Sequence, residues 1–246
     1  MSDIFSTAVV TGASRGFGRA IAAALVDAGA DVVGIARGEA DLAATRRDLG
    51  GRFVPMVADA TDDTLAREVV HARRPGVLVL NAGAVPHMAP VQEQTWETFS
   101  RAWEVDTRHV LAWTRAALLE PLAPGSVVVS ISSGAALHGS PLSGGYAGAN
   151  AAIRHVRAYA AEESDRAALG IRFVTLLPQM TPTAGVGAAG VAGYAARRGV
   201  DPDTLVAEMG TVLSPGAVGA AVVDLVKNPG AAPEQAITGA GLRPVA

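Results

Sequence analysis

Short apolar runs alternate along the chain with longer stretches that are rich in alanine and charged residues. The runs are apolar at successive positions rather than at every second one, which predicts strands buried on both faces, and each intervening stretch is long enough for a helix. The expected strands are 7–11, 31–36, 53–58, 77–80, 126–131 and 172–177, with a short last strand at 235–239. The expected helices are 18–28, 42–49, 64–72, 96–119, 146–169 and 216–227. This alternation predicts the α/β class, with a doubly wound parallel sheet and helices on both faces.

One segment does not follow the pattern. Residues 181–199 are rich in Gly, Ala and Val and lack a clear period, so they are expected to form either a mobile lid or a flexible connection. No linker or internal repeat interrupts the rest of the chain, and residues 1–246 are therefore expected to form a single domain.

Composition limits the classes of function. Half of the residues are hydrophobic and 17% are charged, as in globular proteins, and the net charge of -3 without a basic run argues against a nucleic-acid partner. The chain has no cysteine, which excludes disulfides and thiolate catalysis. We expect no metal centre. No apolar run reaches the ~20 residues of a membrane span, and the N-terminal residues do not resemble a signal peptide, so a cytoplasmic protein is expected.

A glycine-rich segment, TGASRGFG at residues 11–18, joins the first expected strand to the first expected helix. Gly12 permits a sharp exit from the strand, and Gly16 and Gly18 let the backbone and the helix N-terminus approach a pyrophosphate. Tight turns need glycine in any case, so the segment alone is also compatible with a purely structural turn.

Four more motifs follow in order. They are Asp59-Ala60 after the third strand, Asn81-Ala82-Gly83 after the fourth, Ser133 thirteen residues before Tyr146, and Pro178 spaced five residues from Thr183. In order and spacing the whole set resembles the short-chain dehydrogenase/reductase family, over nearly the entire chain. The resemblance implies a Rossmann-type domain that binds a nicotinamide dinucleotide, acts on a small-molecule carbonyl or alcohol, and assembles as a homotetramer or homodimer.

The charge at the end of the second strand predicts which dinucleotide is bound. An acidic residue there would bind the adenosine ribose and repel a 2′-phosphate, but the chain has Ala36 followed by Arg37. Arg15 in the glycine-rich segment is expected nearby, and two guanidinium groups without a carboxylate favour NADP(H). Both arginines could instead be solvated surface charges. The expected cofactor-binding residues are Gly12, Ser14, Arg15, Gly16, Phe17, Gly18, Arg37, Asp59, Ala60, Asn81, Ala82, Gly83, Tyr146, Asn150, Pro178, Thr181 and Thr183.

The catalytic tetrad that the resemblance implies is only half retained. Family members use Asn, Ser, Tyr and Lys; here Ser133 and Tyr146 match, but Asn150 occupies the lysine position and Asp106 the asparagine position. Asn150 could still bind ribose hydroxyls, but it carries no charge to stabilise a tyrosinate, and an ionised Asp106 would oppose one. In addition, Gln179 replaces the glycine after Pro178. These four residues, Ser133, Tyr146, Asn150 and Asp106, are the catalytic candidates.

Two side chains could substitute for the missing cation. Arg154 lies four residues beyond Asn150 on the same helical face, and His138 lies between Ser133 and Tyr146 in a region that lines the substrate pocket in the family. For Arg154 the alternative is a contact between subunits, and for His138 an ordinary polar loop residue.

The leading functional prediction is an NADP(H)-dependent oxidoreductase that interconverts a carbonyl and an alcohol. The expected pocket segments, 85–91, 134–141 and 180–199, are small and apolar, which favours a small to medium, apolar substrate. The alternatives are a catalytically weak or silent NADP(H)-binding protein and non-redox chemistry on the same scaffold, such as elimination or epimerisation. Retention of Ser133 and Tyr146 favours an enzyme.

Overall fold

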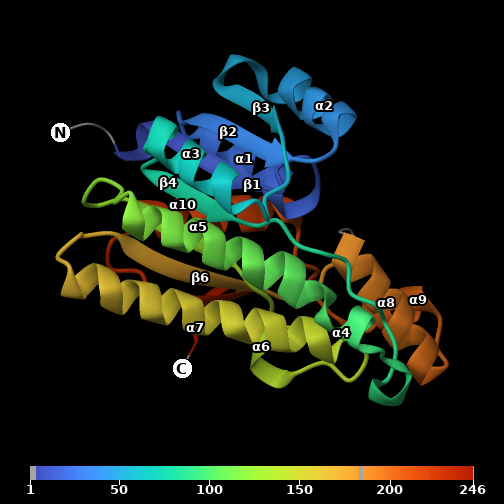
Figure 1. The fold of residues 1–246 in the computed structure, drawn as a ribbon. Coiled ribbons are helices and arrows are strands. Elements are labelled where there is room, and N and C mark those ends of the chain that lie inside the picture. The colour runs from blue at the N-terminus through green and yellow to red at the C-terminus, as the bar shows by residue number, and fades with distance from the viewer. Residues whose placement is uncertain (1–3, 183–184, 246) are drawn as a thin grey trace.

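The centre of the computed structural model, which describes residues 4–182 and 185–245, is a sheet of eight strands in the order β3-β2-β1-β4-β5-β6-β7-β8 (Figure 1). The strands are β1 (Thr7–Thr11), β2 (Asp31–Ala36), β3 (Phe53–Val57), β4 (Val77–Leu80), β5 (Val127–Ile131), β6 (Arg172–Pro178), β7 (Glu234–Thr238) and β8 (Gly241–Pro244). All neighbours pair in parallel except β7 and β8. The strand order reverses between β1 and β4, and in such sheets ligands bind beyond the carboxyl ends of the strands at this point.

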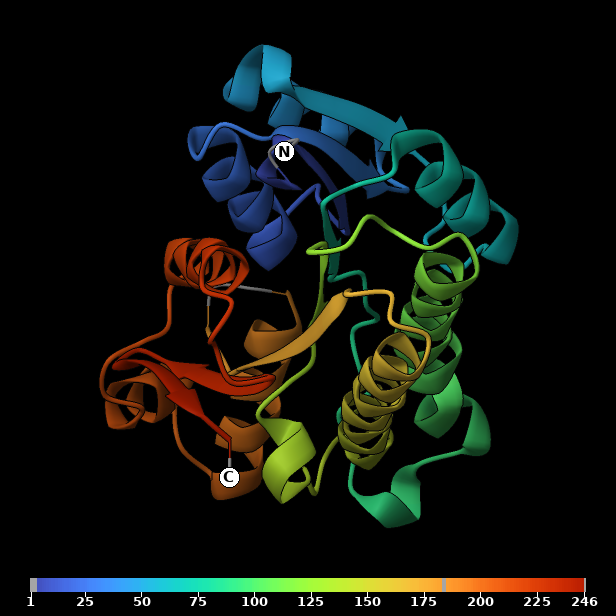
Figure 2. The ribbon, with the colours of Figure 1, turned by 90° about the vertical axis from the view of Figure 1, so that its left-hand side faces the viewer.

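Helices cover both faces of the sheet, as the apolar runs predict (Figure 2). The longer helices are α1 (Gly16–Asp27), α2 (Glu39–Leu49), α3 (Asp63–Arg73), α5 (Arg108–Leu119), α7 (Gly144–Arg166) and α10 (Pro215–Lys227). One apolar core lies between the sheet and the helices α1, α2 and α10, and a second lies between the opposite face and the helices α3, α5 and α7. The α/β prediction is therefore confirmed. Within the described ranges, no helix is both long and apolar enough to cross a lipid bilayer.

The expected helix 96–119 is divided into three parts. It consists of α4 (Trp96–Ala102), a π-helical turn (Trp103–Thr107) and α5. An apolar period cannot reveal a single wide turn, because the periodicity resumes on either side of it. The π-helical turn contains Asp106, and such turns are frequent at functional sites.

Other differences lie near the end of the sheet where the site is found. Residues 181–199 are not a flexible connection through their length, because α8 (Gly185–Arg198) occupies most of the segment and packs with α9 (Pro202–Glu208) in a small apolar cluster of their own. The loop after Ser133 contains one helical turn, α6 (Ala135–His138). The sequence pattern does not predict the last strand, β8, which makes the sheet antiparallel at one edge.

Candidate active site

A cavity of about 830 Å³ lies at the carboxyl ends of the parallel strands and extends from the glycine-rich turn to α8. Its wall contains nearly every residue singled out from the sequence. The catalytic candidates Ser133, Tyr146, Asn150 and Asp106 all line it, together with Gly12, Ser14, Arg15, Gly16, Phe17, Arg37, Asp59, Ala60, Asn81, Ala82, Gly83, Pro178 and Thr181. Gly18 is not part of the wall, and Thr183 lies outside the described residues. The fold thus brings motifs from the whole chain into one cavity.

The glycine-rich turn is held by Asn81. Gly12 has a φ of 68°, and the Asn81 side-chain amide donates to the carbonyls of Thr11 (3.1 Å) and Gly12 (3.3 Å). A Cβ on Gly18 would lie 2.1 Å from the Gly12 carbonyl oxygen. Gly18 is therefore required for packing of α1 behind the turn, whereas the sequence suggested a direct role in the approach of a phosphate. Arg15, the N-cap residue of α1, makes no hydrogen bond through its side chain to the helix. The N–H groups in the first turn of α1 are therefore able to bind an anion.

Beneath this turn lies a network that the sequence analysis missed. The Thr11 hydroxyl accepts from the backbone N–H groups of Asn81 (2.9 Å) and Ala82 (3.2 Å), and it lies 2.9 Å from Nε2 of His109. His109 is fully buried, and burial lowers its pKa to about 3, so that its ring is neutral despite the opposing influence of Asp59. The sequence signal that could have identified His109 is its spacing of one helical turn from Asp106. This network fixes the Asn81–Ala82 backbone at the cavity wall.

Both arginines expected to select the cofactor, Arg15 and Arg37, are exposed and line the cavity. Arg37 lies 4.0 Å from the carboxylate of Asp59. A backbone hydrogen bond from Thr61 holds the pKa of Asp59 below its usual value, and the charge of Arg37 adds to this effect. Asp41 also lines this part of the cavity, which the sequence did not suggest. The adenosine end therefore carries two cations and two carboxylates.

Tyr146 lies in the first turns of α7, half-buried and hydrogen-bonded to the Ser133 hydroxyl. Its pKa is raised to about 12, chiefly by burial; the hydrogen bond with Ser133 lowers it, and the nearby charge of Asp106 raises it further. The neighbouring serine has a different role, since the Ser132 hydroxyl donates to the backbone carbonyl of Asn150 at 3.0 Å and so ties β5 to α7. Tyr146 is therefore a protonated phenol at neutral pH.

Asn150, at the position where a lysine is expected, is 2% exposed and turns back on its own helix. Its side-chain amide donates to the backbone carbonyl of Tyr146 at 3.0 Å. Because an amide carries no charge, it does not lower the pKa of the tyrosine as an ammonium group would.

Asp106 is 5% exposed, and one of its carboxyl oxygens accepts the N–H of Ala84 at 2.7 Å. The carboxyl group packs against the Asn81-Ala82-Gly83 turn, because a Cβ added to Gly83 would lie 3.3 Å from both of its oxygens. Burial raises the pKa of Asp106 to about 7, although the Ala84 hydrogen bond acts in the opposite direction. A carboxyl group that changes charge near neutral pH therefore lies in the wall beside Tyr146.

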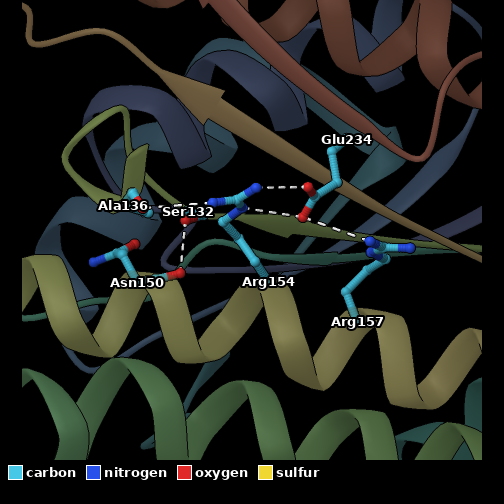
Figure 3. Close-up of polar contacts among 6 residues, drawn as sticks. All are labelled: Ser132, Ala136, Asn150, Arg154, Arg157 and Glu234. Atoms are coloured by element: carbon cyan, nitrogen blue, oxygen red, sulfur yellow. Dashed lines mark hydrogen bonds and ion pairs between the residues drawn. The ribbon is translucent and has the colours of Figure 1, made fainter. Parts of the chain in front are cut away.

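Arg154 does not take the place of the missing lysine. Figure 3 shows its guanidinium group directed to Glu234 at the start of β7, with contacts of 3.2 and 2.9 Å, and Arg157 reaches the same carboxylate at 3.5 Å. Arg154 also approaches the Ala136 carbonyl of α6 at 3.5 Å. The prediction that Arg154 could substitute for the missing lysine cation is therefore wrong. His138, the last residue of α6, is exposed and lines the cavity.

The wall opposite the nucleotide motifs is closed by α8. Tyr194 on this helix hydrogen-bonds Ser140, which in turn lies 2.7 Å from the hydroxyl of Ser143 at the N-cap of α7. The hydroxyl of Thr181 donates to the Leu213 carbonyl at 2.7 Å. The bond between Tyr194 and Ser140 thus attaches α8 to the segment between α6 and α7.

Comparisons with known proteins agree with this arrangement. The model of the family described as short chain dehydrogenase matches residues 6–190. The chain is 34% identical over 206 residues to an uncharacterized oxidoreductase of Methylorubrum extorquens, covering 80% of this chain and 82% of that protein. It is 35% identical over 193 residues to cis-4-hydroxycyclohexanecarboxylate dehydrogenase of Sinomonas cyclohexanicum, covering 74% and 77%.

Two further similarities are more limited. The match to D-erythrulose reductase of Gallus gallus, 35% identical over 128 residues, spans about half of each protein, 51% of this chain and 52% of the relative. The crystal structure of levodione reductase superposes with a TM-score of 0.78 over 90% of both chains at 21% sequence identity, which supports the fold.

Proposed function

The chain belongs to the short-chain dehydrogenase family, and on this basis we propose that it is an NADP(H)-dependent oxidoreductase that interconverts a carbonyl and an alcohol on a small to medium substrate with an apolar body. The observation that carries the proposal is the single cavity that joins the glycine-rich turn and Arg37 to Tyr146 and Ser133. The dehydrogenase and reductase activities named for the similar proteins are consistent with it.

The residues at the nucleotide end fit a nicotinamide dinucleotide. The first turn of α1, which has no side-chain cap, would offer N–H groups to the pyrophosphate, and Arg15 and Arg37, which line the cavity, would bind an adenosine 2′-phosphate. Asn150 and Tyr146 are the polar groups that would meet the nicotinamide ribose. When bound, the nicotinamide supplies a hydride to a carbonyl carbon or accepts one from an alcohol.

Side chains of the protein supply and accept the proton that the reaction requires. In reduction, the Tyr146 hydroxyl donates its proton to the substrate oxygen, while the Ser133 hydroxyl hydrogen-bonds the same atom. A phenol with a raised pKa is present in its protonated form at neutral pH, and the tyrosinate that would act as a base is scarce. We therefore propose that reduction is the faster direction at neutral pH, and that protonated Asp106 favours it by removing a negative charge from beside Tyr146.

The raised pKa of Tyr146 also favours a second candidate function, a nucleotide-binding protein with weak or no turnover. Burial raises the pKa of Tyr146 to about 12, and Asn150 provides no cation to lower it. NADPH oxidation measured over a panel of apolar ketones and aldehydes distinguishes the two functions. An oxidoreductase turns over part of the panel, whereas a silent binder shows affinity for NADPH without any turnover above background.

Arg37→Gln should weaken NADPH binding by about tenfold and leave NADH binding within about twofold. A charge-assisted pair contributes roughly 1.5–3 kcal/mol, and the exposure of Arg37 places it at the lower end. Isothermal titration of both cofactors tests this, with Arg47→Gln as the control, because Arg47 is an exposed arginine of α2 that does not line the cavity. Equal NADPH and NADH affinities in the wild-type protein would contradict the assignment.

Asn150→Lys should lower the pKa of Tyr146 and shift the pH optimum of turnover downward. The new ammonium group would lie one helical turn from the phenol and gain Asp106, which lines the same cavity, as a partner. Ultraviolet titration of the phenol, corrected by the same variant carrying Tyr146→Phe, gives the pKa directly. If neither this pKa nor the pH–rate profile changes, then proton exchange at Tyr146 does not depend on the residue at this position.

A further inference from the structure

Arg243, which sequence analysis did not single out, lies in the wall of the cavity on the unexpected strand β8. Figure 2 shows the C-terminal strand close to α6, the helical turn that carries His138. Arg243 pairs with Ala236 of β7, and residues directly opposite one another on antiparallel strands present their side chains on the same face of the sheet. Glu234 precedes Ala236 by two residues and shares that face.

Glu234 is the carboxylate that could neutralise Arg243, but it is already bound by two other arginines. Arg154 holds both of its oxygens, at 3.2 and 2.9 Å, and Arg157 adds a third contact at 3.5 Å (Figure 3). The Arg243 side chain forms no ion pair or hydrogen bond with any described residue. Arg243 is thus an exposed arginine that lines the cavity without a partner among the described residues, and Glu234, the acid on its face of the sheet, is already paired with Arg154 and Arg157.

The two ends of the cavity differ in charge. At the adenosine end, two arginines are balanced by Asp41 and Asp59. Among the described wall residues from Ile131 onward, His138 and Arg243 are the basic side chains, and no carboxylate is present. The remaining side chains of this part are uncharged, and they include the amides of Asn150 and Gln179. The described wall around the catalytic candidates thus includes one carboxyl group, Asp106 beside Tyr146, while Arg243 on β8 has no carboxylate partner.

We infer that the substrate carries a carboxylate on its apolar body and that Arg243 binds this carboxylate while the reacting carbonyl lies at Tyr146 and Ser133. The inference deepens the proposed function and rests on it. A guanidinium group can bind a carboxylate through two parallel N–H···O bonds, which fixes orientation as well as charge. The site would therefore distinguish an oxo acid from the corresponding uncharged ketone.

The test compares oxo acids of increasing chain or ring size with their own methyl esters, as substrates for reduction by NADPH. The wild-type protein should prefer the acid over its ester in kcat/KM. Arg243→Gln should lower kcat/KM for the acid by about tenfold, mostly through KM, and leave the ester unchanged. Arg197→Gln is the matched control, since Arg197 is an exposed arginine in the last turn of α8 that does not line the cavity.

Three outcomes with Arg243→Gln would overturn the inference. They are an unchanged kcat/KM for the acid, an equal loss for acid and ester, and a loss of NADPH affinity in the variant, which would place Arg243 in the fold or at the cofactor. If the panel of apolar ketones and aldehydes is reduced but no acid is, the inference fails and the proposed function stands. If nothing is reduced, the proposed function fails, and calorimetric titration of the NADPH complex with the oxo acids decides the inference separately. Binding of an acid that is lost in Arg243→Gln supports it, and the absence of binding rejects it.

Discussion

Tyr146→Phe should reduce turnover by about 10²–10⁴-fold and hardly change the affinity for NADPH, because most of the cofactor contacts are remote from the phenol hydroxyl. The substitution removes the hydroxyl that donates the proton to the substrate oxygen and keeps the ring that packs at the start of α7. The phosphate-binding turn and Arg37 lie on other elements, at the opposite end of the cavity, so the nucleotide contacts are retained. Steady-state NADPH oxidation and calorimetric cofactor binding, measured on the same preparation, give the two quantities.

Tyr159→Phe provides the control for this substitution. Tyr159 is on the same helix but 64% exposed, where its ring stacks with that of His155, and the loss of its hydroxyl should not alter turnover. Turnover that survives in Tyr146→Phe would show that the proton comes from another group. His138, at the end of α6 in the same wall, would then be the first residue to examine.

The architecture was predictable from the sequence because its signals are local and repeated. Buried strands such as 7–11 and 77–80 are continuous apolar runs, and the structure places β1 and β4 at these positions. Motifs at the ends of these strands converge because parallel strands direct their carboxyl ends to one edge. The gathering of Gly12 and Asn81 around one cavity follows from this geometry, whereas Tyr146 reaches the cavity from the first turns of α7.

Features that depend on the partner of a side chain could not be predicted in this way. Arg154 was placed on the correct face of its helix, but its pairing with Glu234 depends on the position of β7, which lies 80 residues further along the chain. The wide turn at Asp106 and the strand β8 similarly lack a periodic signal of their own. Arg243 was overlooked for that reason, because a short strand after a tight turn has too few residues for a pattern.

The roles of the glycines were also only partly apparent. A TGxxxGxG spacing indicates where glycine is needed but not which atom requires it. The structure shows that Gly12 adopts a positive φ, whereas Gly18 is needed because the Gly12 carbonyl lies where its Cβ would be. The motif thus combines groups that face a ligand with groups that let α1 pack closely against the turn.

Asp106→Asn should stabilise the protein by up to about 4 kcal/mol at pH 8 and have little effect near pH 4. Burial raises the pKa of Asp106 from its ordinary 3.8 to about 7, and each tenfold change in proton affinity corresponds to about 1.4 kcal/mol between the two protonation states. Between these two pKa values the folded protein retains a proton that the unfolded chain has lost. The free energy of unfolding of the wild-type protein therefore falls as pH rises through this range, and this contribution levels off above about pH 7.

The asparagine keeps the contacts and removes the charge. Its amide oxygen can accept the N–H of Ala84 as the carboxyl oxygen does, and its size suits the close packing against Gly83. Urea unfolding of both proteins at several pH values between 4 and 8 measures the difference, which should grow with pH. Asp224→Asn, at an exposed position of α10, is the control for removal of a carboxylate charge at the surface.

The pH dependence, rather than the size of the stabilisation, decides the role of Asp106. A constant difference between pH 4 and 8 would mean that the carboxyl group is ionised throughout and that burial does not raise its pKa. A difference that grows with pH would mean that the folded protein carries a neutral acid beside Tyr146 below about pH 7 and a carboxylate above it. In that case reduction should also become slower above pH 7 in the wild-type protein, because the carboxylate repels the negative charge that develops on the phenol oxygen as its proton leaves, and this decline should be absent in Asp106→Asn.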